Sequence, residues 1–234
     1  MLKKIVVLLA VIVAGFLAFA AAQPTLYRVQ RSAKIEAPAS VVFAQLSDFK
    51  AWAAWSPWEG KDPAMRKTYE GTPGTVGATY AWQGNAQVGE GRMTITGVQA
   101  PMELKLRLEF IKPFAAVAST QFIVAPEPGG GVTATWSMDG TNNLMAKIFG
   151  LFVNMDKMVG GDFEKGFAKL KQVAEAEAQK QAAEAAAAAK AKAEAEAAAA
   201  AQAKADAEAA AALAVAEEEE KEKDKGKKAK GKKH

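Results

Sequence analysis

Three tryptophans lie within seven positions in WAAWSPWEGKDP, residues 52–63, although the whole chain contains only five. Indole rings at this spacing suit one of two tasks: an aromatic cage around a ligand, or a packed corner where the chain turns. On a helix, Trp52 and Trp55 are three residues apart and share a face. Pro57 ends such a helix, so Trp58 leaves on an extended segment and need not join them. The spacing therefore favours a packed corner, with the Trp55 indole facing the entrance of a cavity.

The side chains that most often act as bases and nucleophiles are missing from the part of the sequence with the mixed composition of a packed domain. The chain contains no cysteine, and its single histidine is His234, the last residue. These absences exclude disulfides, thiolate and histidine metal sites, and histidine-based acid–base or triad catalysis. The acidic residues nearest the predicted loops form no recognisable pair and suit caps and turns: Asp48, Glu59, Asp62 and Asp139. We therefore predict no catalytic residue, no metal site and no cofactor.

The elements that must position these side chains begin with a strand over residues 26–36. Pro38 suits the first turn of a helix in residues 36–48, and Asp48 is placed to cap a second short helix that carries the tryptophans. From there to about residue 141 apolar and polar residues alternate, most clearly in ELKLRLEF, residues 103–110, between turn signals rich in glycine and proline. This pattern predicts six or seven antiparallel strands with one apolar face.

A helical period returns after the strands. One apolar stripe repeats at offsets of three and four residues: Met155, Met158, Val159, Phe163, Phe167 and Leu170. Gly160 and Gly161 interrupt it, although glycine costs about 1 kcal/mol relative to alanine inside a helix. Either the helix bends or is hollowed beside a cavity there, or the main helix begins at Asp162 as its N-cap.

This order of elements resembles the SRPBCC superfamily (START/Bet v 1-like), specifically its polyketide cyclase/dehydratase-like bacterial proteins. The resemblance covers about residues 27–176 and is carried by RSAKIEAPASVVFAQLSDFKAWAAWSPW, VGEGRMTIT and GGDFEKGFAKLKQVAE. It implies an α+β helix-grip domain over residues 25–176, in which a curved antiparallel sheet of six to seven strands grips the long C-terminal helix around a cavity for an apolar ligand. Functions within this superfamily vary widely, so the fold alone does not assign one.

The helix-grip fold places a ligand pocket between the apolar face of the sheet and the helix. The predicted ligand-binding set is Trp55, Tyr80, Trp82, Met93, Leu106, Leu108, Phe110, Phe122, Trp136, Met138, Met158 and Phe163. The alternative is that these side chains simply fill the core. Glu90 and Arg92 form an outward ion pair or, across a bulge, an inward polar pair, and we favour the outward one. The apolar connection LMAKIFGLFVNM, residues 144–155, gates the pocket, touches a membrane or, as we favour, is buried against the sheet edge.

The N-terminal segment, residues 1–24, is predicted to be a membrane anchor or a signal segment. Ile5–Ala22 carries no charge, and its 18 residues reach about 27 Å, close to the roughly 30 Å hydrocarbon core of a bilayer. Lys3 and Lys4 favour a cytoplasmic N-terminus, which places the domain on the periplasmic or external side. Alternatively, cleavage near Ala22 releases the domain to the periplasm. Both alternatives export the domain.

The C-terminal third is of low complexity. Alanine, the best helix former, occupies 24 of the 35 positions in residues 182–216, which predicts a solvated helix over residues 177–220. The lysine-rich end, residues 221–234, is predicted to be disordered. In composition the tail is similar to the spacer helices of envelope-spanning bacterial proteins such as TolA. It either delivers a basic tip to an anionic envelope partner, such as phospholipid headgroups, or is an unconstrained extension.

Three functions from different classes remain open. The first is an exported, membrane-tethered binding protein for a lipid or other small hydrophobic ligand, without catalysis. The second is a cyclase/dehydratase-like enzyme that uses carboxylates in the cavity. The third is a cell-envelope interaction protein that acts through its tail. The formal net charge of only +4 gives no footprint for nucleic acid.

Overall fold

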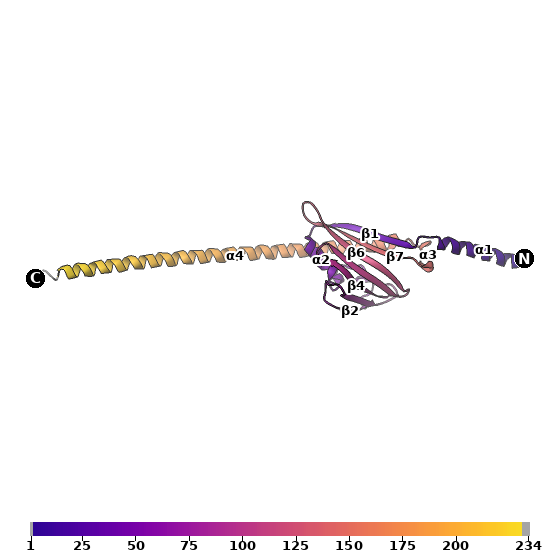
Figure 1. The fold of residues 1–234 in the computed structure, drawn as a ribbon, viewed down its shortest axis with the longest axis horizontal. Coiled ribbons are helices and arrows are strands. Elements are labelled where there is room, and N and C mark those ends of the chain that lie inside the picture. The colour runs from indigo at the N-terminus through magenta and orange to yellow at the C-terminus, as the bar shows by residue number, and fades with distance from the viewer. Residues whose placement is uncertain (1, 231–234) are drawn as a thin grey trace. The chain divides into compact units, whose positions relative to one another are not determined.

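The computed structural model describes residues 2–230, apart from the side chains of residue 219 and of residues 222–230 (Figure 1). The chain divides into two compact units, Met1–Gln179 and Lys180–His234. The elements follow in the order α1 (Leu2–Ala21), β1 (Leu26–Ile35), α2 (Ala39–Ser47), η1 (Ala51–Ala54), η2 (Glu59–Lys61), β2 (Arg66–Glu70), β3 (Thr79–Gln83), β4 (Glu90–Gln99), β5 (Glu103–Lys112), β6 (Ala116–Pro126), β7 (Val132–Thr141), α3 (Leu144–Gly150) and α4 (Met155–Lys230).

Seven strands form one antiparallel sheet in the order β1-β7-β6-β5-β4-β3-β2, which confirms the predicted strand number. Along β5 the burial alternates as the sequence predicts: Leu104, Leu106 and Leu108 are buried, whereas Lys105 and Arg107 are exposed. Register shifts at two points in the pairing of β4 with β5 mark bulges, which add local bend and twist. The buried face of the sheet thus becomes the concave side, where the core lies.

The beginning of α4 packs against this concave face. Its buried side chains repeat every three or four residues: Phe163, Phe167, Leu170 and Ala174. The Trp136 indole of β7 stacks on the ring of Phe163, with ring centroids 3.9 Å apart, and meets Phe167 edge-on at 6.0 Å. Sheet and helix bury their apolar surfaces against each other, as an α+β helix-grip fold requires.

The tryptophan corner closes the end of α2. The last carbonyl groups of a helix lack partners within the helix and need donors from elsewhere. The Trp52 Nε1–H group donates to the carbonyl oxygen of Leu46 at 2.8 Å, and the Trp55 Nε1–H group donates to that of Gln45 at 3.1 Å. Both indoles are buried, with ring centroids 4.8 Å apart. These two tryptophans therefore form the predicted packed corner and cap α2.

Gly160 and Gly161 lie inside α4, so Asp162 is not the N-cap of the main helix. A Cβ atom at Gly160 would overlap the Arg31 guanidinium of β1, whereas one at Gly161 would meet no atom within 4 Å. The hollow at Gly160 thus admits an arginine from the sheet rather than a ligand. Two carboxylates of α4 hold this guanidinium: Asp156 at 3.0 Å and Glu164 at 2.7 Å.

The apolar connection after β7 forms α3 and is not covered by the sheet. Phe149 is 51% exposed and Phe152 is 76% exposed. The ring of Phe152 faces that of Phe16 in α1, with centroids 6.4 Å apart, and the Lys147 Nζ atom donates to the carbonyl oxygen of Ala21 at 2.9 Å. The prediction that this connection is buried against the sheet edge is therefore wrong, because its neighbour is α1 rather than a strand.

The helix α1 has 20 residues, of which only Ala20 is buried. It is the one helix among the described residues that is long and apolar enough to cross a membrane, and a signal sequence passes the same test.

In the second unit, α4 continues as a helix through Lys230 and so includes residues 221–230, for which the sequence favours disorder. The last four residues, 231–234, lie outside the described residues. The described side chains of this unit are exposed, and three Lys–Glu pairs four residues apart stand at 3.9 Å. Such exposed pairs stabilise a helix by roughly 0.3–0.5 kcal/mol each, so the stability of this helix comes mainly from the helix propensity of alanine.

Candidate functional site

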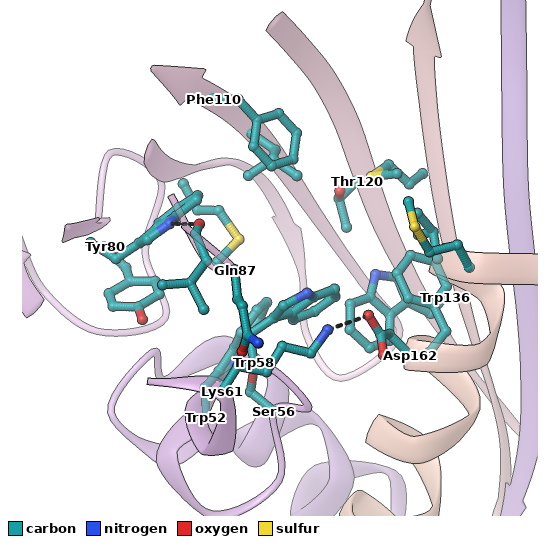
Figure 2. Close-up of a pocket in the computed structure, with 18 of the residues that line it drawn as sticks. Trp52, Ser56, Trp58, Lys61, Tyr80, Gln87, Phe110, Thr120, Trp136 and Asp162 are labelled. Carbon is teal, nitrogen blue, oxygen red and sulfur yellow. Dashed lines mark hydrogen bonds and ion pairs between the residues drawn. The ribbon is translucent and has the colours of Figure 1, made fainter. Parts of the chain in front are cut away.

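A cavity of about 370 Å³ lies between the concave face of the sheet, the short helices η1 and η2, and the first turns of α4 (Figure 2). This volume falls in the range of roughly 300–1,000 Å³ that is typical of small-molecule sites. Most of its wall is carbon from aromatic and methionine side chains, which come from the sheet on one side and from α4 on the other. The cavity is therefore suited to an apolar molecule.

Nine of the twelve predicted side chains line the cavity: Tyr80, Trp82, Met93, Leu108, Phe110, Trp136, Met138, Met158 and Phe163. The other three, Trp55, Leu106 and Phe122, are fully buried and do not line it. The rings of Trp52 and Trp55 meet Phe122 edge-on at 5.9 and 6.3 Å and fill that part of the concave face. The cavity is thus confined to the part nearer the end of the sheet from which β1 begins.

Trp58 corrects the interpretation of the tryptophan stretch. Instead of leaving on an extended segment, the chain turns back, and the Trp58 ring packs edge-on against Trp136 at 5.7 Å and Phe163 at 6.4 Å. Trp52 and Trp58 line the cavity, whereas Trp55 does not. The prediction that the Trp55 indole faces the cavity entrance is therefore not met, because its N–H group is directed to the end of α2.

A partly shielded ion pair joins η2 to α4 beside the cavity. The Lys61 Nζ atom donates to the Asp162 carboxylate at 2.7 Å (Figure 2). The Asp162 side chain is only 14% exposed, and the Lys165 ammonium lies 3.6 Å from its other oxygen. This carboxylate lines the cavity but is already engaged by two ammonium groups. Its first role is therefore to fix the short helices against α4.

One buried polar atom in the cavity wall has no partner. Among the described residues, the Trp136 Nε1–H group is the only fully buried side-chain donor or acceptor without a hydrogen bond. The residue is 2% exposed, and its ring faces the cavity (Figure 2). An unsatisfied buried donor costs roughly 1–3 kcal/mol. A ligand oxygen that accepts this hydrogen bond would remove the cost.

Tyr80 also lines the cavity, but its hydroxyl group is engaged. It donates to the Glu59 carboxylate at 3.4 Å, and the same carboxylate pairs with Lys67. Burial, and then the nearby negative charge of Glu59, raise the pKa of Tyr80 well above its usual value of 10. The phenol therefore stays protonated at neutral pH and does not act as a base.

Twelve lining residues were not predicted: Tyr27, Trp52, Ser56, Trp58, Lys61, Met65, Gln87, Val88, Thr120, Met155, Val159 and Asp162. Met155 and Val159 belong to the apolar stripe of α4, so the helical period already pointed to them. Most of the others come from turns and short helices, where no period predicts which way a side chain points. In the described part of the chain, no group of three or more Asp, Glu, His or Cys side chains is placed to hold a metal ion.

Glu90 and Arg92 point outward, as favoured, but do not pair with each other. Arg92 contacts Glu109 of the neighbouring strand at 2.9 Å, and Glu90 contacts Lys112 at 2.7 Å. The Arg92 and Lys112 side chains are more than half exposed. These pairs belong to the solvated face of the sheet rather than to the cavity.

The curved sheet, the gripping helix and the cavity between them together define a helix-grip protein with an apolar site. The chain belongs to the family described as "Polyketide cyclase / dehydrase and lipid transport", whose model matches residues 27–175. The match covers the sheet, the short helices and the beginning of α4, and it agrees with the resemblance carried by the sequence.

Several solved structures are similar to the chain. One is a protein from Chromobacterium violaceum, with 15% identity over 65% of this chain and 99% of that one, and a TM-score of 0.46. Another, from Rhizobium leguminosarum, has 15% identity over 64% of this chain and 95% of that one, and a TM-score of 0.47. The two-domain ARO/CYC protein BexL has 15% identity over 68% of this chain and 52% of that one, and a TM-score of 0.46. No curated protein sequence matches the chain.

Proposed function

We propose that the protein binds a small hydrophobic ligand in this cavity, and that the ligand carries a hydrogen-bond acceptor. The observation that carries the proposal is the cavity of about 370 Å³, walled mainly by carbon, with a buried donor left unpaired at Trp136. A family description that includes lipid transport supports an apolar ligand. The ligand's body packs against methionine and aromatic side chains, and a carbonyl, ester or hydroxyl oxygen accepts from Trp136 Nε1.

A matched pair of ligands tests both halves of this proposal. Undecane and 2-undecanone differ by one oxygen, and titration of each into the full chain, followed by NMR, gives two affinities. A net hydrogen bond of about 1 kcal/mol makes the ketone bind roughly fivefold more tightly. In the variant Trp136→Phe, which keeps an aromatic ring but lacks the N–H group, the two affinities become equal. If neither molecule binds, and native mass spectrometry of membrane-extracted protein finds no bound ligand, the binding function is refuted.

We also propose that α1 tethers the domain to a membrane, with the domain on the periplasmic or external side. The length and apolarity of α1 support the tether, and Lys3 and Lys4 in front of its apolar run support this orientation. Protease added to intact spheroplasts should digest the domain without lysis of the cells. N-terminal sequencing of the mature protein separates a tether, which keeps residue 2, from cleavage near Ala22.

A cyclase/dehydratase-like activity is the second candidate, and the observation that favours it is the position of Asp162 in the cavity wall. As a carboxylate with 14% side-chain exposure beside Lys61, it is the acidic group placed to act on a bound molecule. The variant Asp162→Asn distinguishes the two functions. A binding protein keeps its affinity for 2-undecanone, whereas an enzyme loses turnover of a poly-β-keto substrate while still binding it.

A further inference from the structure

Exposed apolar side chains from three separate segments gather at one end of the first unit. They come from the start of β1, from the turn between β5 and β6 with the first residues of β6, and from α3 with the residues that follow it. We call this set the apolar end face: Leu26, Phe114, Val117, Met145, Phe149 and Phe152. Phe114 and Phe152 are each 76% exposed, so large aromatic surface faces outward here.

The strand register shows that these segments share one end. Leu26 of β1 pairs with Thr141, the last residue of β7, and Gly140 of β7 pairs with Ala118 of β6. A shallow groove lined by residues of β1, β6 and β7, among them Leu26 and Val117, joins the strands. The chain leaves β7 directly into α3, and the Asn142 N–H group donates to the carbonyl oxygen of Thr25 at 2.7 Å. The start of β1, the start of β6 and α3 are therefore neighbours.

The opposite end of the sheet has a different surface. Among the described residues, its exposed large apolar side chains are Val76 and Met102, which stand on separate turns, and Ile123 of β6, which pairs with Glu103 at the start of β5. The turn between β6 and β7 contains Gly129, Gly130 and Gly131, all with positive φ, and no large apolar residue. The apolar end face is thus a property of one end of the domain and not of its surface in general.

The covalent connection to α1 indicates what covers this face. Only residues 22–25 separate the end of α1 from Leu26, and a fully extended chain spans at most about 3.6 Å per residue. Leu26 therefore lies within roughly 18 Å of Ala21 whatever direction α1 takes. The Phe16–Phe152 ring contact and the hydrogen bond from Lys147 to Ala21 join α1 to α3 more closely still. A bilayer that receives α1 must meet this end of the domain first.

We propose that the apolar end face lies in the boundary between headgroups and acyl chains of the bilayer that α1 enters. Phe114, Phe149 and Phe152 then act as interfacial anchors, as aromatic side chains commonly do at this depth. The face adjoins the cavity. Met155, three residues after Phe152, lines the cavity, and so does Met158, which is 49% exposed. A ligand accordingly moves between the bilayer and the cavity past Met158, a step that rests on the proposed binding function.

The natural absence of cysteine makes the depth of this face directly measurable. Single cysteines replace Phe114 or Phe152 in the full chain, with Val76 and Met102 as controls at the opposite end that are also more than half exposed. Each variant carries a nitroxide label and is reconstituted into phosphatidylcholine and phosphatidylglycerol vesicles. The labels at Phe114 and Phe152 should collide more often with oxygen, which concentrates in lipid, than with a water-soluble nickel complex. The two control labels should show the reverse ratio.

Two outcomes overturn the docking proposal. If the labels at Phe114 and Phe152 collide with the nickel complex as often as the control labels do, these two positions face water. Labels shielded from both oxygen and nickel are covered by protein, either a second copy or another partner. The exchange step has its own readout: at saturating 2-undecanone, which offsets any change of affinity, the variant Met158→Trp should slow transfer of the ketone between vesicles severalfold. Unchanged transfer refutes the route past Met158 alone, and absent binding refutes the binding function instead.

Discussion

Adjacent glycines in α4 should respond to alanine in different ways, although both lie inside the same helix. At Gly161 an added Cβ atom meets nothing within 4 Å. Replacing an interior helical glycine by alanine then stabilises the folded state by about 1 kcal/mol. For a domain of roughly 150 residues this raises Tm by about 2–4 °C. Gly161→Ala is therefore predicted to be a stabilising substitution.

At Gly160 the same substitution meets the Arg31 guanidinium, which is held between Asp156 and Glu164. The helix gains as much from alanine here as at Gly161. Placing a methyl group in filled space, however, costs typically about 1–3 kcal/mol, because the group that occupies the space must move. The gain is cancelled or outweighed, so Gly160→Ala should melt at or below the temperature of the unmodified protein and at least about 2 °C below Gly161→Ala.

Differential scanning calorimetry of the full chain measures both variants, because the cooperative transition belongs to the packed domain. The control is the Arg31→Ala background, in which the space at Gly160 is empty. There Gly160→Ala should recover the stabilisation seen for Gly161→Ala. Equal stabilisation by both alanines in the presence of Arg31 would refute the reasoning, since it would show that the guanidinium does not occupy the hollow of α4.

Other predictions concern protonation, the tryptophans and the tail. Burial first, and the nearby Glu59 carboxylate second, raise the pKa of Tyr80, and burial also raises that of the other two tyrosines. Their stabilisation is fully present below pH 10 and is lost as the pH rises above it, so a spectrophotometric titration should show tyrosinate at a higher pH in the folded than in the unfolded chain, with Tyr80 ionising last and together with unfolding. Trp55→Phe should lower the free energy of unfolding by about 1–3 kcal/mol, because a carbonyl group of α2 loses its donor, yet leave the affinity for 2-undecanone unchanged. Trp58→Ala should weaken that affinity, since its ring walls the cavity. Deletion of residues 180–234, a separate unit, should leave the Tm of the domain unchanged, so any cellular defect it causes reports a function of the tail.

The fold was largely predictable because its two periods are strong. In β5, leucine alternates with charged residues without a break, and a strand with that pattern buries one face. The apolar stripe of α4 repeats every three or four residues, and a helix with that stripe must cover an apolar sheet. The direction of each of the nine predicted lining residues follows from one of these periods.

The rest depended on contacts between distant segments. Whether Phe122 lines a cavity or is covered depends on Trp52 and Trp55, which lie some 70 residues earlier in the chain and reach it through a 3₁₀ turn without a period. The presence of glycine at position 160 is explained only by the Arg31 side chain of β1, which fills the space that a Cβ atom would need. The apolar character of α3 predicts burial in any globular domain, and its exposure becomes intelligible only beside α1.

The packing of the indoles has an optical consequence. Trp52 and Trp55 have ring centroids 4.8 Å apart, and Trp136 lies 5.8 Å from Trp55 and 5.7 Å from Trp58. At such separations excitation energy passes from ring to ring before a photon is emitted, so four of the five tryptophans of the chain behave as one chromophore. Light absorbed at the closed corner of the fold is thereby shared with Trp136, which lines the cavity and whose N–H group is unpaired. The protein carries its own luminescent reporter of whatever enters that space.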